Sequence, residues 1–105
     1  MIFLVYHFDM EKYHYLFGSW GEIKDNKRVD SEGPSFPEDY EVVAAVEADN
    51  IEHVFEKTNH IDRDWTENEG VIPTKTRVRS TSCGDVVVDG SGNRLICASM
   101  GWEKI

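Results

Sequence analysis

The residues with the clearest chemical potential lie near the end of the chain, in RSTSCGDVVVDGSGN at positions 79–93. This stretch combines Cys83 with several hydroxyl side chains, two aspartates and a Gly-Ser-Gly sequence. Residues of these types build cysteine nucleophiles, phosphate-binding loops and calcium loops. Each of these sites also requires particular neighbours, so the flanking sequence decides among them.

The Gly-Ser-Gly sequence favours a hairpin turn over a phosphate-binding loop. A phosphate loop binds best where it opens a helix, because the helix N-terminus adds N–H donors and a favourable dipole. Here the flanking segments, VVV and LIC, are typical of strands. Glycine and asparagine tolerate the positive φ that hairpin turns require, so residues 90–93 are predicted to form the turn. The aspartates also lack the spacing of a calcium loop.

Cys83 would need a base or a positive neighbour to become a nucleophile. Arg79 is close in sequence, and His53 or His60 could approach it in space. A small buried thiol is the commoner role for such a residue. The sequence therefore favours a packing role for Cys83.

A disulfide between Cys83 and Cys97 is not expected, because two cysteines are too few for a disulfide framework. In the predicted hairpin register Asp89 faces Arg94 and Val86 faces Cys97. Alternation along the strands then places the two thiols on opposite faces of the sheet.

The histidines do not follow a zinc-binding spacing, and no metal or other cofactor is predicted. A polar pocket is an alternative source of activity. If the end of the central helix meets the start of the hairpin, His60 becomes an acid–base candidate in a small enzyme or ligand-binding domain. The residues of this possible pocket are Asn59, His60, Asp62, Arg79, Ser82 and Asp85.

The net charge of −9 is concentrated in the middle of the chain. Residues 30–69 hold thirteen acidic residues against Lys57 and Arg63, whereas residues 1–29 are balanced and residues 70–105 carry a net charge of +2. Such a field repels nucleic-acid phosphates and attracts basic protein surfaces. Direct nucleic-acid binding is therefore not predicted, although KTRVR at 75–79 is basic.

The acidic region predicts a face that binds a basic protein. Trp65 stands among acids, where an exposed aromatic ring would anchor a partner while the carboxylates orient it. Two other interpretations stay open: Trp65 closes the underside of a long loop, and the acids only solvate the surface. The residues predicted for the face are Glu47, Asp49, Glu52, Glu56, Asp62, Asp64, Trp65, Glu67 and Glu69.

One domain, residues 1–105, is predicted to carry these candidates. The apolar run at 2–8 suits a strand buried on both faces. Residues 13–20 predict a second strand or a helical turn, residues 24–39 an exposed loop, and residues 40–48 a further strand.

The central helix is predicted over residues 50–59, with Asp49 as N-cap and Glu52 completing a capping box. An irregular acidic connection follows, then a hairpin of residues 85–89 and 94–98 and a last extended segment. The expected fold class is α+β: a small mixed or antiparallel sheet, one main helix and a C-terminal β-hairpin. The inward face of the helix should consist of Ile51, Val54, Phe55 and Thr58.

FEKTNHID, WTENEGV and RSTSCGDVVVD together resemble an arrangement in small uncharacterised proteins of bacteriophages and plasmids. The likeness covers roughly residues 40–105, and the final GWEKI is similar to the usual ending of those proteins. They have valine where Cys83 stands, which supports a packing role. The motif members are Asn59, His60, Asp62, Trp65, Asn68, Arg79, Ser80, Ser82, Gly84 and Asp85.

The resemblance implies a mobile-element accessory protein and carries no established activity. Combined with the acidic region, it predicts a non-enzymatic protein that binds a basic host protein, as an anti-defence or nucleic-acid-mimicking inhibitor. A structural or virion-associated role is a third alternative and would predict self-association. No signal peptide or membrane segment is recognised, so the expected location is the host cytoplasm.

Overall fold

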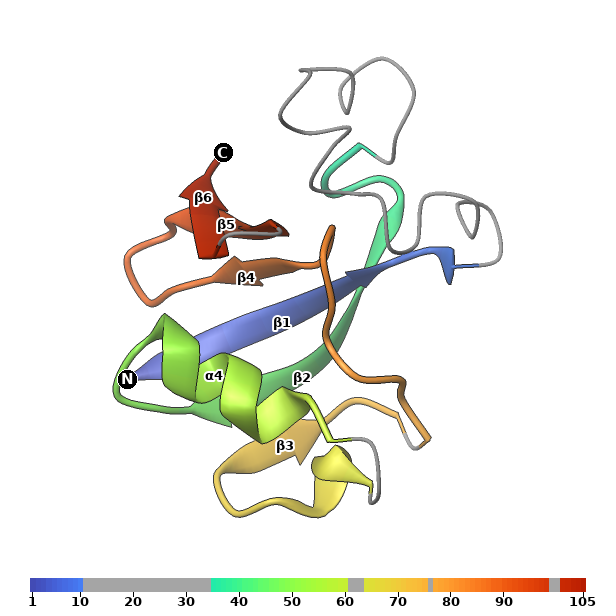
Figure 1. The fold of residues 1–105 in the computed structure, drawn as a ribbon, viewed down its shortest axis with the longest axis vertical. Coiled ribbons are helices and arrows are strands. Elements are labelled where there is room, and N and C mark those ends of the chain that lie inside the picture. Colours follow the sequence, from blue (N-terminus) through green and yellow to red (C-terminus); the bar gives the residue numbers. More distant parts are fainter. Residues whose placement is uncertain (11–34, 61–63, 76, 99–100) are drawn as a thin grey trace.

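The computed structural model describes residues 1–10, 35–60, 64–75, 77–98 and 101–105. These residues form a six-stranded antiparallel sheet in the order β3-β2-β1-β4-β5-β6, with the helix α4 on one face (Figure 1). The predicted α+β class is confirmed. The element predicted at 13–20 and most of the loop predicted at 24–39 lie outside the described residues.

The sheet is built around the first strand, which pairs with β2 on one side and β4 on the other. A short strand, β3, and a 3-10 turn, η2, lie within the connection that the sequence predicted to be irregular. The bounds are β1 Ile2–Phe8, β2 Tyr40–Glu47, α4 Ile51–Thr58, η2 Trp65–Glu67, β3 Val71–Pro73, β4 Val86–Val88, β5 Arg94–Ala98 and β6 Gly101–Lys104.

The two halves of β1 differ in burial. Phe3 and Val5 face α4 and are buried in the main core, whereas Ile2 and Leu4 point to the other face and stay exposed. The prediction of a strand buried on both faces is therefore wrong for this half. It holds at the end of β1, where Phe8 is buried in a second, smaller core on the other face of the sheet.

The helix begins one residue later than predicted. Asn50 is the N-cap, and its side-chain oxygen accepts a hydrogen bond of 2.9 Å from the backbone N–H of His53. The prediction of Asp49 as the cap is wrong, because Asn50 has the extended backbone that a cap requires. Asn59 is the C-cap, as the sequence indicated.

The predicted inward face of α4 is confirmed. Val54 and Thr58 are fully buried, and Ile51 and Phe55 are half-buried along one flank. Lys57 on the opposite flank donates hydrogen bonds to backbone carbonyls next to β3. The helix therefore lies with Lys57 toward the β3 edge of the sheet and with Phe55 toward the β6 edge.

The hairpin has the predicted turn but a different register. Val86 pairs with Ile96, not with Cys97, and Val88 pairs with Arg94. The reason is Asp89, whose carboxylate accepts hydrogen bonds from N–H groups within the turn. Asp89 therefore belongs to the turn and not to the strand, and the pairing shifts by one residue.

A turn and a bulge precede β4, and both depend on Gly84. The N–H of Asp85 donates to the carbonyl of Ser82, and Gly84 at the third position of this turn has φ of 96°. Cys97 then opposes two residues, because it accepts from the N–H of Gly84 and donates to the carbonyl of Asp85. A left-handed glycine opposite a single partner is a recurrent form of bulge.

The bulge also brings the two cysteines together. Burial, and then the neighbouring Cys83 thiol, raises the pKa of Cys97 to about 12. Both thiols are free, and Cys83 packs against the core around Phe8 and Ile96. The two thiols interact although they were predicted to lie on opposite faces of the sheet, because the bulge interrupts the regular ladder that the prediction assumed.

Replacement of Gly84 by Ala should lower the free energy of unfolding by about 1–3 kcal/mol, because a Cβ disfavours this left-handed backbone. Urea unfolding measures the change. Gly90→Ala is the matched control: Gly90 has no positive φ, and its added Cβ would meet only the Ile2 carbonyl at 3.9 Å. Equal stability of the two variants would contradict this role for Gly84.

Candidate functional site

A buried ion pair joins the segment before β4 to the end of β1. Asp85 has no exposed surface, and its carboxylate accepts two hydrogen bonds of 2.7 Å from the guanidinium of Arg79. The same carboxylate accepts from the backbone N–H groups of Phe8 at 3.1 Å and Ser82 at 2.8 Å. Four hydrogen bonds therefore satisfy a charge that would otherwise be very costly to bury.

The guanidinium of Arg79 is committed to the same junction. Besides Asp85 it contacts the carbonyls of Phe8 and Ser80 and the hydroxyl of Ser82. Its Cζ lies 4.9 Å from the centre of the Phe8 ring. These contacts make Arg79 a structural residue.

The end of α4 meets this segment, as the sequence suggested. Thr81 donates its N–H to the carbonyl of Thr58, and its own carbonyl accepts from the side chain of Asn59 at 2.7 Å. The hydroxyl of Ser80 accepts from the N–H of His60 and donates to the carbonyl of His60. Two irregular segments are thereby locked together by polar groups.

Trp65 connects the η2 turn to the same network of hydrogen bonds. Its side chain is only 1% exposed, and its Nε1 donates a hydrogen bond of 2.9 Å to the carbonyl of Arg79. The predicted role as a surface anchor is therefore wrong, and the alternative, closure of the loop, is what the structure shows. Asn68 acts similarly by donating to the carbonyl of Lys57.

The motif residues of the described chain thus serve the fold, and they do not assemble the predicted pocket. Asp85 is enclosed by its hydrogen bonds, while His60 and Arg79 line two different hollows. Asp62, also proposed for that pocket and for the acidic face, lies outside the described residues.

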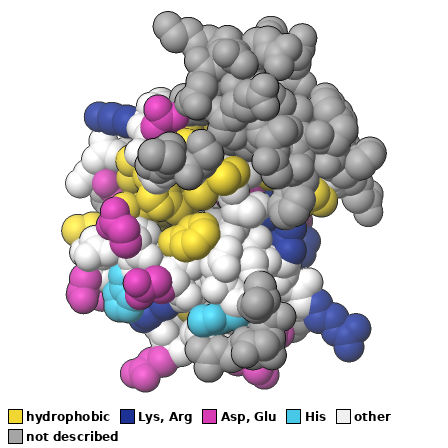
Figure 2. All heavy atoms as spheres, in the orientation of Figure 1, with side chains coloured by type: hydrophobic (Ala, Val, Ile, Leu, Met, Phe, Trp, Pro, Cys, Tyr) yellow, Lys and Arg dark blue, Asp and Glu magenta, His cyan; other side chains and the backbone are white. Residues whose placement is uncertain are grey.

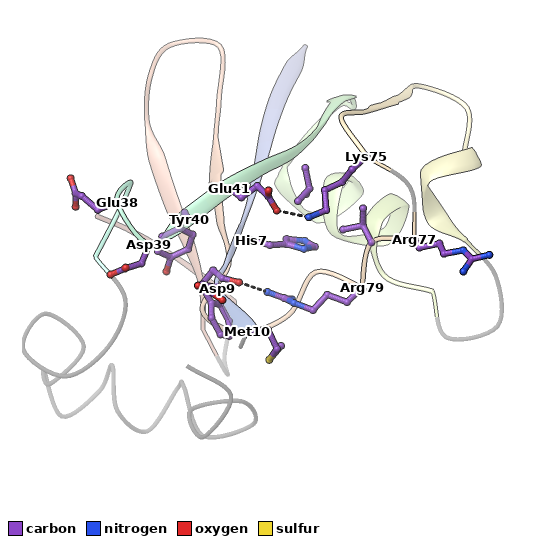
Figure 3. A pocket seen from close by; sticks show the side chains of 13 residues that line it. His7, Asp9, Met10, Glu38, Asp39, Tyr40, Glu41, Lys75, Arg77 and Arg79 are labelled. Atoms are coloured by element: carbon purple, nitrogen blue, oxygen red, sulfur yellow. Dashed lines mark hydrogen bonds and ion pairs between the residues drawn. The ribbon is translucent and has the colours of Figure 1, made fainter. Parts of the chain in front are cut away.

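The larger hollow, about 570 Å³, lies beside the end of β1 (Figure 3). This volume is within the range of small-molecule sites. Figure 3 shows Lys75, Arg77 and Arg79 on one wall, and the carboxylate of Glu41 bridges to Lys75 at 2.5 Å. The lining combines charged and apolar side chains, and two of its cations, Lys75 and Arg79, already have partners within the chain.

His7 is the functional candidate that sequence reasoning missed. Its ring lines the hollow between Lys75 and Arg79 (Figure 3), is 5% exposed, and bonds through Nε2 to the hydroxyl of Thr81 at 2.9 Å. The pKa of His7 is lowered to about 4, chiefly by burial; Asp85 opposes this shift and Arg79 contributes to it. The ring is therefore neutral at pH 7. A histidine inside the apolar run at 2–8 was the available signal.

The acidic residues lie around α4 and η2, and the seven described carboxylates of the predicted face are all exposed. Figure 2 shows Asp and Glu side chains gathered along this flank of the molecule. Asp49 lies 3.9 Å from His53, and Glu47 pairs with the terminal ammonium at 2.8 Å. Those seven carboxylates are Glu47, Asp49, Glu52, Glu56, Asp64, Glu67 and Glu69.

Few cations offset this charge. Lys57 lines a hollow with Glu47, Glu56 and Glu69 but donates to the backbone carbonyls of Glu47 and Glu69 rather than to a carboxylate. Hydrogen bonds from Thr66 lower the pKa of Asp64, and Arg77 adds to this effect. Across the described residues, none of the seven carboxylates forms an ion pair with a Lys or Arg side chain.

Within the same described ranges, no group of three or more His, Cys, Asp or Glu residues could hold a metal ion, and no helix is long and apolar enough to cross a membrane. Comparison of the chain with protein-family models, curated proteins and solved structures found no match.

Replacement of Asp85 by Asn should lower the free energy of unfolding by about 3–5 kcal/mol, because the charge of Arg79 would remain without its counter-charge. Urea unfolding again provides the measurement. Glu41→Gln breaks an exposed ion pair and should cost less than about 1 kcal/mol. A small loss for Asp85→Asn would show that the buried pair is dispensable.

The shifted pKa of His7 predicts loss of stability in acid. The pKa falls from an ordinary 6.5 to about 4 on folding, so the unfolded chain takes up the proton first as the pH falls. The free energy of unfolding should therefore be unaffected by His7 above pH 6.5 and decrease by about 3 kcal/mol toward pH 4. His7→Gln, measured by urea unfolding over the same range, should flatten this part of the profile, and an unchanged slope would refute the assignment.

Proposed function

We propose that this protein is a non-enzymatic binding protein whose acidic face occupies a basic surface of another protein. One observation carries the proposal: seven carboxylates around α4 and η2 are exposed, and within the described residues none of them forms an ion pair with a Lys or Arg side chain. Surface charge of one sign accelerates and orients encounter with a partner of opposite charge. The partner class is therefore a protein with exposed Lys and Arg residues.

The mechanism would be occlusion of a nucleic-acid-binding surface. Carboxylates presented on a rigid helix can take the positions that phosphates occupy along a nucleic-acid backbone, and a partner that binds phosphates offers the complementary cations. The likeness to phage and plasmid proteins makes a host nuclease or regulator the target that we propose. The protein would then act in the host cytoplasm as an accessory or anti-defence factor.

The proposal is tested by capturing a partner from host lysate and measuring its affinity at several salt concentrations. The double replacement Glu52→Lys and Glu56→Lys should weaken binding at least about 10-fold, and added salt should weaken binding of the unmodified protein, because both act on charge contacts.

Glu38→Lys is the matched control, since Glu38 is exposed but belongs to the turn before β2, outside the acidic face. It should bind like the unmodified protein. Affinity that is independent of salt and of the α4 charges would overturn the proposal. Capture of only a second copy of the chain would favour the structural or virion-associated alternative.

A further inference from the structure

Within the described residues, α4 is the one α-helix on its side of the sheet, and it covers only part of that side. Val54 of α4 packs with Phe3 and Val46, which belong to β1 and β2. Figure 1 shows β5 and β6 extending beyond the helix on this side. The strands of a two-layer domain normally bury this surface under a further element. The area beside α4 is therefore a candidate contact surface.

Apolar side chains line this area both from α4 and from the strands β5 and β6. The ring of Phe55, on the flank of α4, meets the ring of Trp102 edge-on, with centroids 6.2 Å apart and planes at 77°. Trp102 pairs with Cys97, and Leu95 lies two residues earlier on β5, so Leu95 and Trp102 share a face. We call Ile51, Phe55, Leu95 and Trp102 the aromatic corner; all four are half-buried.

Charge borders the aromatic corner on its helix side. Glu52 and Glu56 each follow a corner residue on α4 and are exposed. Figure 2 shows hydrophobic side chains between α4 and the C-terminal strands, with Asp and Glu side chains along the helix. Lys104 is exposed on the strand side, where its neighbour across the ladder is Leu95. Binding hot spots combine such half-buried aromatic residues with a polar rim.

We propose that the aromatic corner anchors the partner of the acidic face, and that the docking element of the partner is a basic amphipathic helix. Its apolar stripe would pack on Phe55 and Trp102, and its Lys or Arg residues would face Glu52 and Glu56. The inference rests on the proposed function and names the anchor that Trp65 does not supply.

The geometry favours a helix over an added strand. Helices pack about 8–10 Å apart, so a helix placed beside α4 reaches Phe55 and Trp102 together. A strand paired to the outer edge of β6 would lie in the plane of the sheet, away from Phe55. Only a docked helix of the partner therefore contacts the carboxylates of α4 and the apolar surface at the same time.

Two synthetic peptides of equal charge separate the apolar contribution from the electrostatic one. The first is a helix of about 18 residues with leucine and lysine at amphipathic spacing, and the second replaces the leucines by serine. Fluorescence anisotropy with the full chain should show the leucine peptide binding at least about 10-fold more tightly. Trp102→Ala should remove most of this advantage and leave the serine peptide unaffected.

Phe55→Ala is a second variant at a half-exposed helix position, and it should have the same effect with less risk to folding. Ile72→Ala is the matched control, because Ile72 is 68% exposed on β3 and lies outside the corner. Circular dichroism confirms that each variant is folded.

The outcomes distinguish the two proposals. If Trp102→Ala and Phe55→Ala leave the leucine preference intact, the aromatic corner is not the anchor, whatever the charges do. If the double replacement Glu52→Lys and Glu56→Lys weakens binding of the serine peptide, the proposed role of the acidic face is still supported. If neither peptide responds to salt or to charge reversal, the acidic face itself is refuted.

Discussion

The buried pair of Arg79 and Asp85 is the constraint on which the described fold depends. Asp85 collects N–H donors from β1 and from the turn before β4, and Arg79 returns contacts to the carbonyl of Phe8. The carbonyl of Arg79 receives the indole of Trp65, so the η2 turn is fixed to the same point. This one ion pair therefore connects β1, the segment before β4 and the η2 turn. Because Asp85 is fully buried, loss of Arg79 would leave an uncompensated charge in the interior, so Arg79 cannot be replaced independently.

This network gives the chemically suggestive motifs a structural role. Hydroxyl, amide and carboxylate groups gather there because irregular backbone carries donors and acceptors that need partners when buried. Ser80 satisfies both backbone groups of His60, and Asn59 satisfies the carbonyl of Thr81. A dense polar motif is therefore as good a sign of a buried junction as of catalysis. Exposure to solvent distinguishes a functional site from a buried junction. By this criterion the exposed carboxylates of α4 are the better candidates.

Sequence patterns captured what depends on local spacing. The helix, β2 and the turn of the final hairpin were all predicted. The failures have both local and distant causes. The hairpin register shifted because Asp89 joined the turn, and Trp65 turned inward because the carbonyl of Arg79 offered its indole a partner. His7 looked like a core position, and only the tertiary structure places it beside Thr81 and a polar hollow.

Charge has one role inside this protein, where it holds the fold together, and another on the surface, where it supports the proposed binding. Inside, the ion pair of Arg79 and Asp85 is neutral as a unit and fully hydrogen-bonded, so it fixes the scaffold without requiring solvent. Outside, like charges crowd one end of a small domain, and their mutual repulsion destabilises the folded state. A basic partner would relieve that repulsion while adding its own attraction. The scaffold must therefore be held by something other than surface charge, and the buried network around Asp85 serves that purpose.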